Sequence, residues 1–365
     1  MQAHKICYFA GVTNDRGGAG RVLFTNLRLI DRSRFSPIVL LPGHGKAKKM
    51  LDELDISYQV WGSLTEFSHP LTYGKAIIRA TLWFRQQKVE LVHINRANDW
   101  RSAELLAARL CRIPVIYHFH MVNRDNAPAT RMATAIVAVS RYVAENSHTF
   151  GVPTKVIYNP VDFERFDRAD SIRVPLDLDK KHVVVTFVGQ VRKIKGIEDF
   201  IAMARQVTGE QVRFLIVGHC RDERSFTDAF TEEELYALMS YDSRIRYYGY
   251  QTKIQDIYHA SDIVVVPSRC EEAFGLVAAE AGAAGKAVVA NRVGGIPEVI
   301  VDKETGYLVE AGDVQDMVYR VQQLVDSPAL RSTLGNAARA RIYREFTTKP
   351  VRALEACYET LLSRA

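Results

Sequence analysis

Two glutamates, Glu272 and Glu280, stand eight residues apart at the junction of a strand-like and a helix-like stretch. Before them, Asp262–Ser268 is a continuous apolar run closed by Pro and Ser, which is typical of a buried strand. After them, Gly275–Ala284 is small and apolar and predicts a buried helix, whose start offers free N–H groups to an anion. A carboxylate for sugar hydroxyls, an anion cradle and a second carboxylate together suit a sugar diphosphonucleotide. A solvated acidic loop before an ordinary helix is the alternative.

A second cluster is cationic. Arg192, Lys193 and Lys195 follow another strand-like run within the turn Gly189–Gly196. At the carboxyl end of a strand and ahead of a helix, such cations can clamp a diphosphate and stabilise it as a leaving group. A solvated basic turn is the alternative.

The segment Gly17–Gly20 opens a helix after the first strand, where its backbone can approach a phosphate closely. A dinucleotide site would need glycines tight against the strand and an acid ending the second strand. Here the glycine cluster starts well beyond Gly11, and the second strand ends in Leu41-Pro42-Gly43, which argues against NAD. Gly43–Ala47 lacks the spacer and the Ser or Thr of a P-loop, so nucleotide hydrolysis has no support.

His118 and His120 alternate at a strand end and therefore share a face. They lack a third ligand at convincing spacing, and the one Asp-x-Asp pair, Asp177 and Asp179, falls in a predicted linker rather than at a strand end. We therefore expect no metal and no other cofactor. Each histidine could instead bind a sugar hydroxyl or a phosphate, or serve a purely structural role.

Alternating strands and helices must position these groups. The predicted strands are Ile6–Ala10, Pro37–Leu41, Leu91–Ile94, Pro114–His118, Ala135–Val139, His182–Val188, Arg213–Val217, Ile245–Tyr248, Asp262–Val266 and Ala287–Ala290. The predicted helices include Arg21–Ile30, Ser102–Cys111, Ile197–Thr208, Thr231–Met239, Gly275–Ala284, Val314–Ser327 and Leu330–Glu345. This alternation predicts an α/β protein with two doubly wound, Rossmann-like domains facing across a cleft. The linker is expected within Asn159–Lys181. We place the domains at 1–165 and 166–345, with a helix at 346–365 packing back on the first.

Composition agrees with two domains. The chain has 365 residues, 47% of them hydrophobic and 25% charged, and a net charge of +6 that favours anionic ligands without choosing among them. The five cysteines are dispersed and fit reduced thiols. The N-terminus lacks a signal-peptide core and no run of about 18 apolar residues occurs, so we expect a cytoplasmic protein.

Taken together, the motifs resemble the retaining GT-B glycosyltransferases of family 4, also called glycosyl transferases group 1. The resemblance covers most of the chain in order and rests on Gly17-Gly18-Ala19, Ile136–Ser140, Val156–Asp162, Phe187–Gly189 with Lys195-Gly196, Val217-Gly218, Asp262–Ser268, Glu272–Glu280, Gly294–Glu298 and Gly306–Val309. The two-carboxylate segment with its preceding strand is specific, whereas the glycine loops are not.

The resemblance implies a role for each site residue. Glu272 would contact donor sugar hydroxyls and Glu280 the ribose hydroxyls, while His120 would lie near the reacting sugar. The backbone N–H groups of Phe274, Gly275 and Leu276 would meet the diphosphate. The remaining donor-binding positions are Gly17, Gly18, Gly189, Arg192, Lys195 and Gly218, with Lys195 also neutralising the leaving group. Two departures stand out: Gln190 replaces an Arg that is usual in the family, and Met121 follows His120 where a small or acidic polar residue is common.

The implied reaction is metal-independent transfer of a hexosyl or related unit from a nucleotide sugar to an acceptor hydroxyl, with retention, in cell-surface polysaccharide or glycolipid biosynthesis. The implied partners are a nucleotide sugar and a sugar or lipid-linked acceptor, with no nucleic acid. The basic amphipathic stretch Tyr73–Gln87 could bind the inner face of a membrane, where the surface is anionic. Alternatively, it could pack against the protein core and leave its basic face in solvent. A sugar-nucleotide epimerase on the same fold and a non-catalytic nucleotide-sugar binding module are the competing interpretations.

Overall fold

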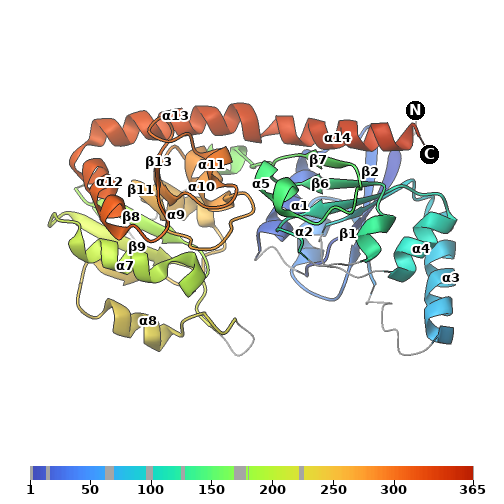
Figure 1. The fold of residues 1–365 in the computed structure, drawn as a ribbon, viewed down its shortest axis with the longest axis horizontal. Coiled ribbons are helices and arrows are strands. Elements are labelled where there is room, and N and C mark those ends of the chain that lie inside the picture. Colours follow the sequence, from blue (N-terminus) through green and yellow to red (C-terminus); the bar gives the residue numbers. More distant parts are fainter. Residues whose placement is uncertain are drawn as a thin grey trace. The chain divides into compact units, whose positions relative to one another are not determined.

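The computed structural model describes residues 3–13, 17–61, 70–95, 102–124, 128–167, 178–179, 181–221 and 226–364. The chain divides into two compact units (Figure 1). The N-unit comprises Met1–Pro160 and Thr348–Ala365, and the C-unit comprises Val161–Thr347. Residues 14–16 of the first glycine loop, and residues 168–177 and 180 of the predicted linker, including Asp177, lie outside the described part of the chain.

The N-unit is built on a seven-stranded parallel sheet in the order β3-β2-β1-β4-β5-β6-β7. Its strands are β1 (His4–Phe9), β2 (Phe35–Leu41), β3 (Ser57–Val60), β4 (Leu91–Ile94), β5 (Val115–Phe119), β6 (Ala135–Ala138) and β7 (Thr154–Val156). Its helices are α1 (Gly18–Leu29), α2 (Ala47–Glu53), α3 (Pro70–Gln87), α4 (Ser102–Leu110), η1 (Pro128–Met132), α5 (Arg141–Asn146) and α14 (Thr348–Leu362).

The C-unit has a six-stranded parallel sheet in the order β10-β9-β8-β11-β12-β13. Its strands are β8 (Val183–Val188), β9 (Val212–Val217), β10 (Ile245–Tyr247), β11 (Ile263–Val266), β12 (Ala287–Asn291) and β13 (Tyr307–Val309). Its helices are α6 (Glu164–Asp167), η2 (Lys193–Lys195), α7 (Ile197–Gln206), α8 (Glu232–Met239), α9 (Ile254–Ala260), α10 (Leu276–Ala283), α11 (Ile296–Val299), α12 (Val314–Asp326) and α13 (Pro328–Phe346).

In both sheets the order in which successive strands are added reverses once, while all strands stay parallel. This strand order confirms the prediction of two Rossmann-like α/β domains. In the N-unit the reversal lies between β1 and β4, and in the C-unit between β8 and β11. Ligands of open parallel sheets bind outside the carboxyl ends of the strands at such a reversal. The cationic turn and the two-glutamate segment predicted from the sequence follow β8 and β11, the two strands on either side of the reversal in the C-unit.

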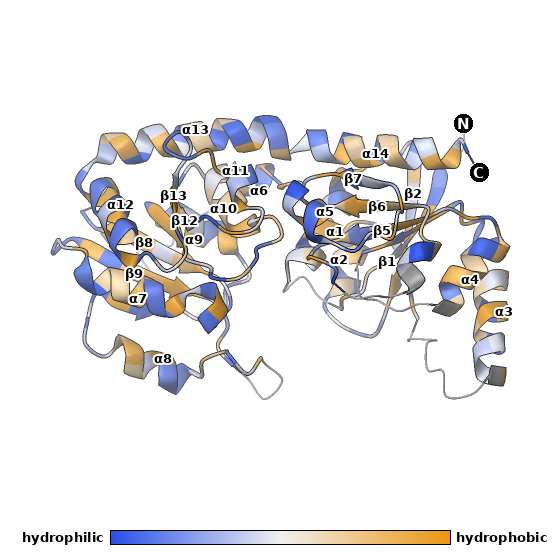
Figure 2. Cartoon of the chain, viewed as in Figure 1, coloured by the Kyte–Doolittle hydropathy of each residue, from blue (hydrophilic) through white to orange (hydrophobic). Residues whose placement is uncertain are grey.

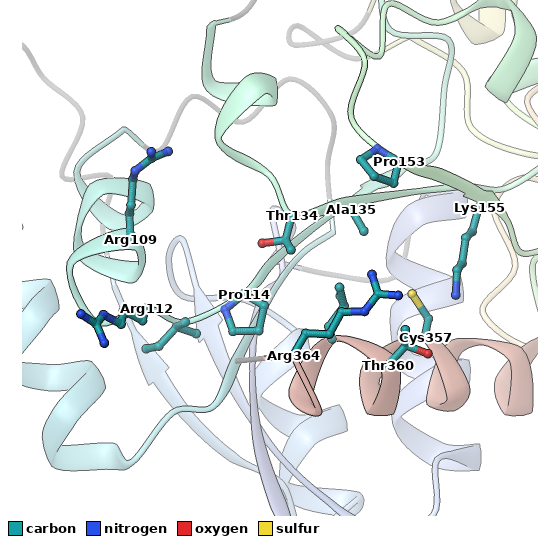
Figure 3. Close-up of a pocket in the computed structure, with 12 residues that line it drawn as sticks. Arg109, Arg112, Pro114, Thr134, Ala135, Pro153, Lys155, Cys357, Thr360 and Arg364 are labelled. Atoms are coloured by element: carbon teal, nitrogen blue, oxygen red, sulfur yellow. The ribbon is translucent and has the colours of Figure 1, made fainter.

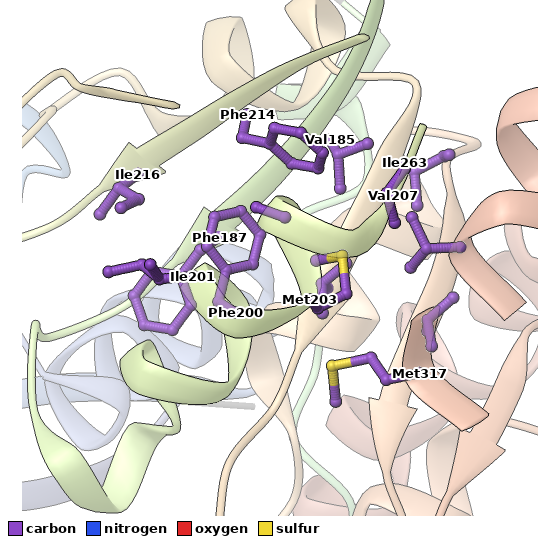
Figure 4. Close-up of a cluster of buried hydrophobic side chains, with 14 of the residues drawn as sticks. Val185, Phe187, Phe200, Ile201, Met203, Val207, Phe214, Ile216, Ile263 and Met317 are labelled. Carbon is purple, nitrogen blue, oxygen red and sulfur yellow. The ribbon is translucent and has the colours of Figure 1, made fainter. Parts of the chain in front are cut away.

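Long apolar runs explain the central strands. Every residue of β8 is buried, and its β-branched and aromatic side chains pack with α7 and α12 into one core (Figure 4). Phe187, Phe200 and Phe214 stand next to each other there, with ring centroids 5.7 and 6.2 Å apart in succession. Such packing fixes the strand ends from which the site residues project.

Three edge strands were missed by the sequence prediction: β3, β7 and β13. β3 and β7 hold no buried residue, and β7 and β13 have three residues each, so periodicity had little to detect. Neighbouring strands supply the hydrogen-bond partners that make these segments extended. α14 contacts the N-unit sheet through a 2.9 Å hydrogen bond between the Tyr8 and Tyr358 hydroxyls.

Candidate active site

An ion pair joins Lys195 to Glu272 at the β8–β11 reversal. The Lys195 Nζ donates to Glu272 Oε1 over 2.6 Å, and the Ser268 hydroxyl donates to the same oxygen over 2.7 Å. Burial lowers the pKa of Lys195, but the Glu272 carboxylate outweighs it, with help from Cys270, so the pKa lies above its usual value. The two charged side chains are 25% and 20% exposed, so an incoming ligand can reach both.

The loop that carries Glu272 is held by the turn after β12. The Gly295 N–H donates to the Glu272 carbonyl over 2.7 Å. Gly294 has a φ of +55°, which favours glycine, and a Cβ there would lie 2.0 Å from the Glu272 carbonyl oxygen. Asn291, fully buried at the end of β12, donates to the Ser268 carbonyl over 3.1 Å. The glycine turn therefore sets the position of Glu272, a role that the sequence did not suggest.

The start of α10 lies immediately after this loop. Gly275 caps the helix with a φ of +90°, again a conformation that favours glycine, and Phe274 before it is buried against Phe346. No acceptor is found among the described residues for the N–H groups of Gly275 and Leu276. These are the orphan donors of a helix start, and they can bind an anion.

Glu280 occupies the second turn of α10 and is only 4% exposed. Its Oε2 accepts a 2.9 Å hydrogen bond from the Tyr258 hydroxyl of α9. Its role toward ribose hydroxyls stays a prediction.

Arg192 pairs with a carboxylate other than Glu272. Its Nη2 and Nε donate to Asp228 Oδ1 over 2.6 and 3.0 Å, and its guanidinium lies 3.7 Å from the centroid of the Phe226 ring. The Arg192 hydrogen bonds hold the pKa of Asp228 below its usual range. The structure thus separates the cations that the sequence grouped, and it gives Arg192 a carboxylate partner of its own.

Gly189 and Gly218 lie at the carboxyl ends of the neighbouring strands β8 and β9. The Gly189 N–H donates to Val217 and the Gly218 N–H donates to Gly249, each over 3.0 Å. A Cβ on Gly218 would lie 1.6 Å from the Gly189 carbonyl oxygen, so the two turns are in direct contact. The two glycine turns thus pack together at the carboxyl ends of β8 and β9, and the first of them leads into the Lys195 turn.

In the N-unit, Gly17 caps α1 and Gly18 is its first residue; a Cβ on either would meet no atom within 4 Å. Asn95, which follows β4, donates to the Ala19 carbonyl over 3.1 Å and presents Oδ1 to His120 Nε2 over 2.9 Å. Because the Asn95 amide nitrogen bonds carbonyl groups, its Oδ1 must accept, and Nε2 of His120 carries the proton.

His120 is consequently a neutral acceptor through Nδ1, which has no partner among the described residues. Burial lowers its pKa to about 3, which keeps the ring uncharged at neutral pH. The His118 ring lies 4.1 Å away on the same face, as the sequence predicted. An unprotonated Nδ1 can accept a hydrogen bond from a hydroxyl group.

His118 belongs to a buried chain of hydrogen bonds. His118 Nδ1 meets His93 Nε2 at 3.1 Å, and His93 Nδ1 meets the Tyr358 hydroxyl at 2.6 Å, which in turn contacts Tyr8. Burial lowers the pKa of His93 to about 3 and that of His118 well below its usual value, so the chain is neutral. This chain of hydrogen bonds links β5, the strand that precedes His120, to α14.

The sequence analysis missed the residues that support the predicted ones, namely Ser268, Asn291, Asn95, His93 and Tyr358. The first three are polar residues at the carboxyl ends of predicted strands, which was a usable signal. No group of three or more metal-ligating side chains occurs within the described ranges. No helix within those ranges is long and apolar enough to cross a membrane.

Comparison with known proteins gives matches over both units of the chain. The family model for Glycosyltransferase Family 4 matches residues 16–165, and the model for Glycosyl transferases group 1 matches residues 169–341. A D-inositol 3-phosphate glycosyltransferase of Corynebacterium aurimucosum is 33% identical over 84% of this chain and 76% of its own length. The N-acetyl-alpha-D-glucosaminyl L-malate synthase of Bacillus anthracis is 29% identical over 76% of this chain and 75% of its own.

The fold is also similar to that of Anabaena HepE, whose crystal structure contains UDP and glucose. The TM-score is 0.79 at 21% identity, with 99% of this chain and all of HepE covered. The strand order of the two parallel sheets, the order of the sequence motifs and the two family-model matches all indicate the same family. We conclude that this chain is an α/β protein of the GT-B fold and belongs to glycosyltransferase family 4.

Proposed function

We propose that the protein is a retaining, metal-independent glycosyltransferase that moves a hexosyl or related unit from a nucleotide sugar to an acceptor hydroxyl. The observation that supports this most directly is the Lys195–Glu272 pair beside the open start of α10 at the β8–β11 reversal. It provides a cation, a carboxylate and peptide N–H groups in one place. These are the groups needed to bind a diphosphate and the hydroxyls of the sugar attached to it.

In the proposed reaction, the bond from the anomeric carbon to the diphosphate oxygen breaks and the acceptor oxygen bonds to the same face of that carbon. The leaving phosphate oxygen takes the acceptor proton, so no separate general base is needed. Lys195 and the α10 N–H groups would stabilise the charge developing on the diphosphate. Glu272 would then accept from donor hydroxyls, and His120 Nδ1 from a sugar hydroxyl.

The acceptor would be a sugar or a lipid-linked sugar in cell-surface polysaccharide or glycolipid biosynthesis. Support comes from α3, along which apolar and polar residues mix (Figure 2). Trp83 and Phe84 are buried, but Ile78 and Leu82 are 61% and 60% exposed on a face that also carries the exposed Lys75 and Arg85. Exposed apolar residues beside cations are typical of helices that lie on an anionic membrane surface.

The experiment is a thermal-shift screen of nucleotide sugars, followed by product analysis with the stabilising donor. We expect one donor class to raise the melting temperature of the wild type, and Glu272→Gln to weaken that effect. Proton NMR of the product should show the anomeric configuration of the donor, and EDTA should leave the rate unchanged. Donor turnover that yields an epimer without releasing the nucleotide would assign an epimerase instead. Binding without any turnover would assign a binding module.

A further inference from the structure

A pocket of about 430 Å³ lies in the N-unit at the amino ends of β5, β6 and β7. The strands are parallel, and Asn95 and His120 follow their carboxyl ends, so the pocket lies at the opposite end of the strands. Its apolar lining includes Pro114 and Ala135 (Figure 3), together with Leu361. The volume lies within the range of pockets that hold small organic ligands.

One face of α14 closes the pocket. Cys357, Thr360 and Leu361 follow the i, i+3, i+4 spacing of a single helix face and line it, and Arg364, in the turn after α14, lines it as well. The carboxylates of α14 serve another contact: Glu355 and Glu359 both pair with Arg34. The pocket face of the helix therefore presents a hydroxyl and a thiol and no carboxylate, and the turn after it adds a cation.

Within the described part of the chain, every charged residue that lines the pocket is positive. Arg109, Arg112, Lys155 and Arg364 line it, and among the described residues none of them forms an ion pair with a carboxylate. Lys155 and Arg364 extend toward Cys357 from β7 and from the turn after α14 (Figure 3). Burial raises the pKa of the Cys357 thiol, and the Lys155 charge acts against this shift, which agrees with their proximity. Lys155 and Arg364 therefore repel each other, because no carboxylate among the described residues pairs with either of them. A bound anion would relieve that repulsion.

We propose that this pocket binds an organic phosphate, with the phosphate held between Lys155 and Arg364 and the apolar part of the ligand against the apolar lining. The Thr360 hydroxyl would supply a further donor. The site is distinct from the one around Lys195 and does not depend on the proposed reaction. It would take either a phospholipid headgroup with part of its chains or a phosphorylated metabolite that carries an apolar group.

The test is calorimetric titration of the full chain with dihexanoyl phosphatidic acid below its micelle concentration. All proteins carry Lys195→Ala, which removes the cation of the C-unit site. In this background we expect Lys155→Gln with Arg364→Gln to raise the Kd by roughly tenfold or more, because two charge-assisted contacts are lost. Arg352→Gln, which removes an exposed cation of α14 that does not line the pocket, should leave the Kd unchanged.

The single variants decide the matter if the double variant fails to fold. Unchanged affinity in these variants, or no binding by the parent, would overturn the proposal. Equal affinity for glycerol 3-phosphate would indicate a metabolite, whereas sedimentation with phosphatidic acid vesicles that requires Lys155 and Arg364 would indicate a membrane lipid.

Discussion

Substitution of Gly294 tests whether the β12 turn positions Glu272. A Cβ at Gly294 would lie 2.0 Å from the Glu272 carbonyl oxygen, whereas real Cβ contacts are essentially never shorter than 3.0 Å. Gly294→Ala must therefore displace the Glu272 loop by about 1 Å. A misplacement of about 1 Å in a catalytic constellation can reduce the rate by roughly 100-fold. We expect that loss in turnover with the donor identified by the thermal-shift screen.

Gly312 provides the matched control. Its φ of +87° also disfavours a side chain, but a Cβ there would meet no atom within 4 Å. Gly312→Ala should therefore cost about 1–2 kcal/mol of stability from backbone strain alone and leave turnover near wild type. Gly294→Ala should show both effects. If the two variants lose turnover equally when assayed well below their melting temperatures, the positioning argument is wrong.

Three further predictions follow from the polar contacts. Lys195→Ala should lower turnover by about 10²–10³ through loss of leaving-group stabilisation, and wild-type rates would remove Lys195 from the reaction. In urea unfolding, Tyr358→Phe should destabilise the protein by roughly 1–3 kcal/mol for each group left unpaired, because the buried His93 Nδ1 loses its partner. Tyr343→Phe, at a tyrosine that is 64% exposed, should change stability by less than about 0.5 kcal/mol, and equal effects would contradict this reasoning. With a pKa of about 3 when folded, His93 takes up a proton more readily in the unfolded chain. The contribution of His93 to the unfolding free energy should therefore be constant above about pH 6.5 and fall by at most about 1.4 kcal/mol per pH unit on acidification toward pH 3. Because the pKa values of His118 and His120 are also lowered, His93→Gln should reduce the total slope without abolishing it.

The central strands and most helices could be predicted because their sequences carry a local signal. β4 spans the predicted Leu91–Ile94, and Thr231 begins α8 through a capping box with Glu234. Short edge strands such as β7 could not be predicted, because their extended form depends on partners distant in the sequence.

The sequence by itself determined which residues follow strands: Lys195 after β8, Glu272 after β11 and His120 after β5. Because parallel strands end at one edge of a sheet, that information was enough to predict two sets of polar groups and the family they resemble. The tertiary structure alone decided which of these groups touch. It paired Lys195 with Glu272 and drew Arg192 away to Asp228. It also brought Asn95 to His120 and Tyr358 to His93. All four contacts join residues 25 to 265 positions apart, and a hydrogen bond forms only over about 3 Å, so sequence spacing cannot specify them.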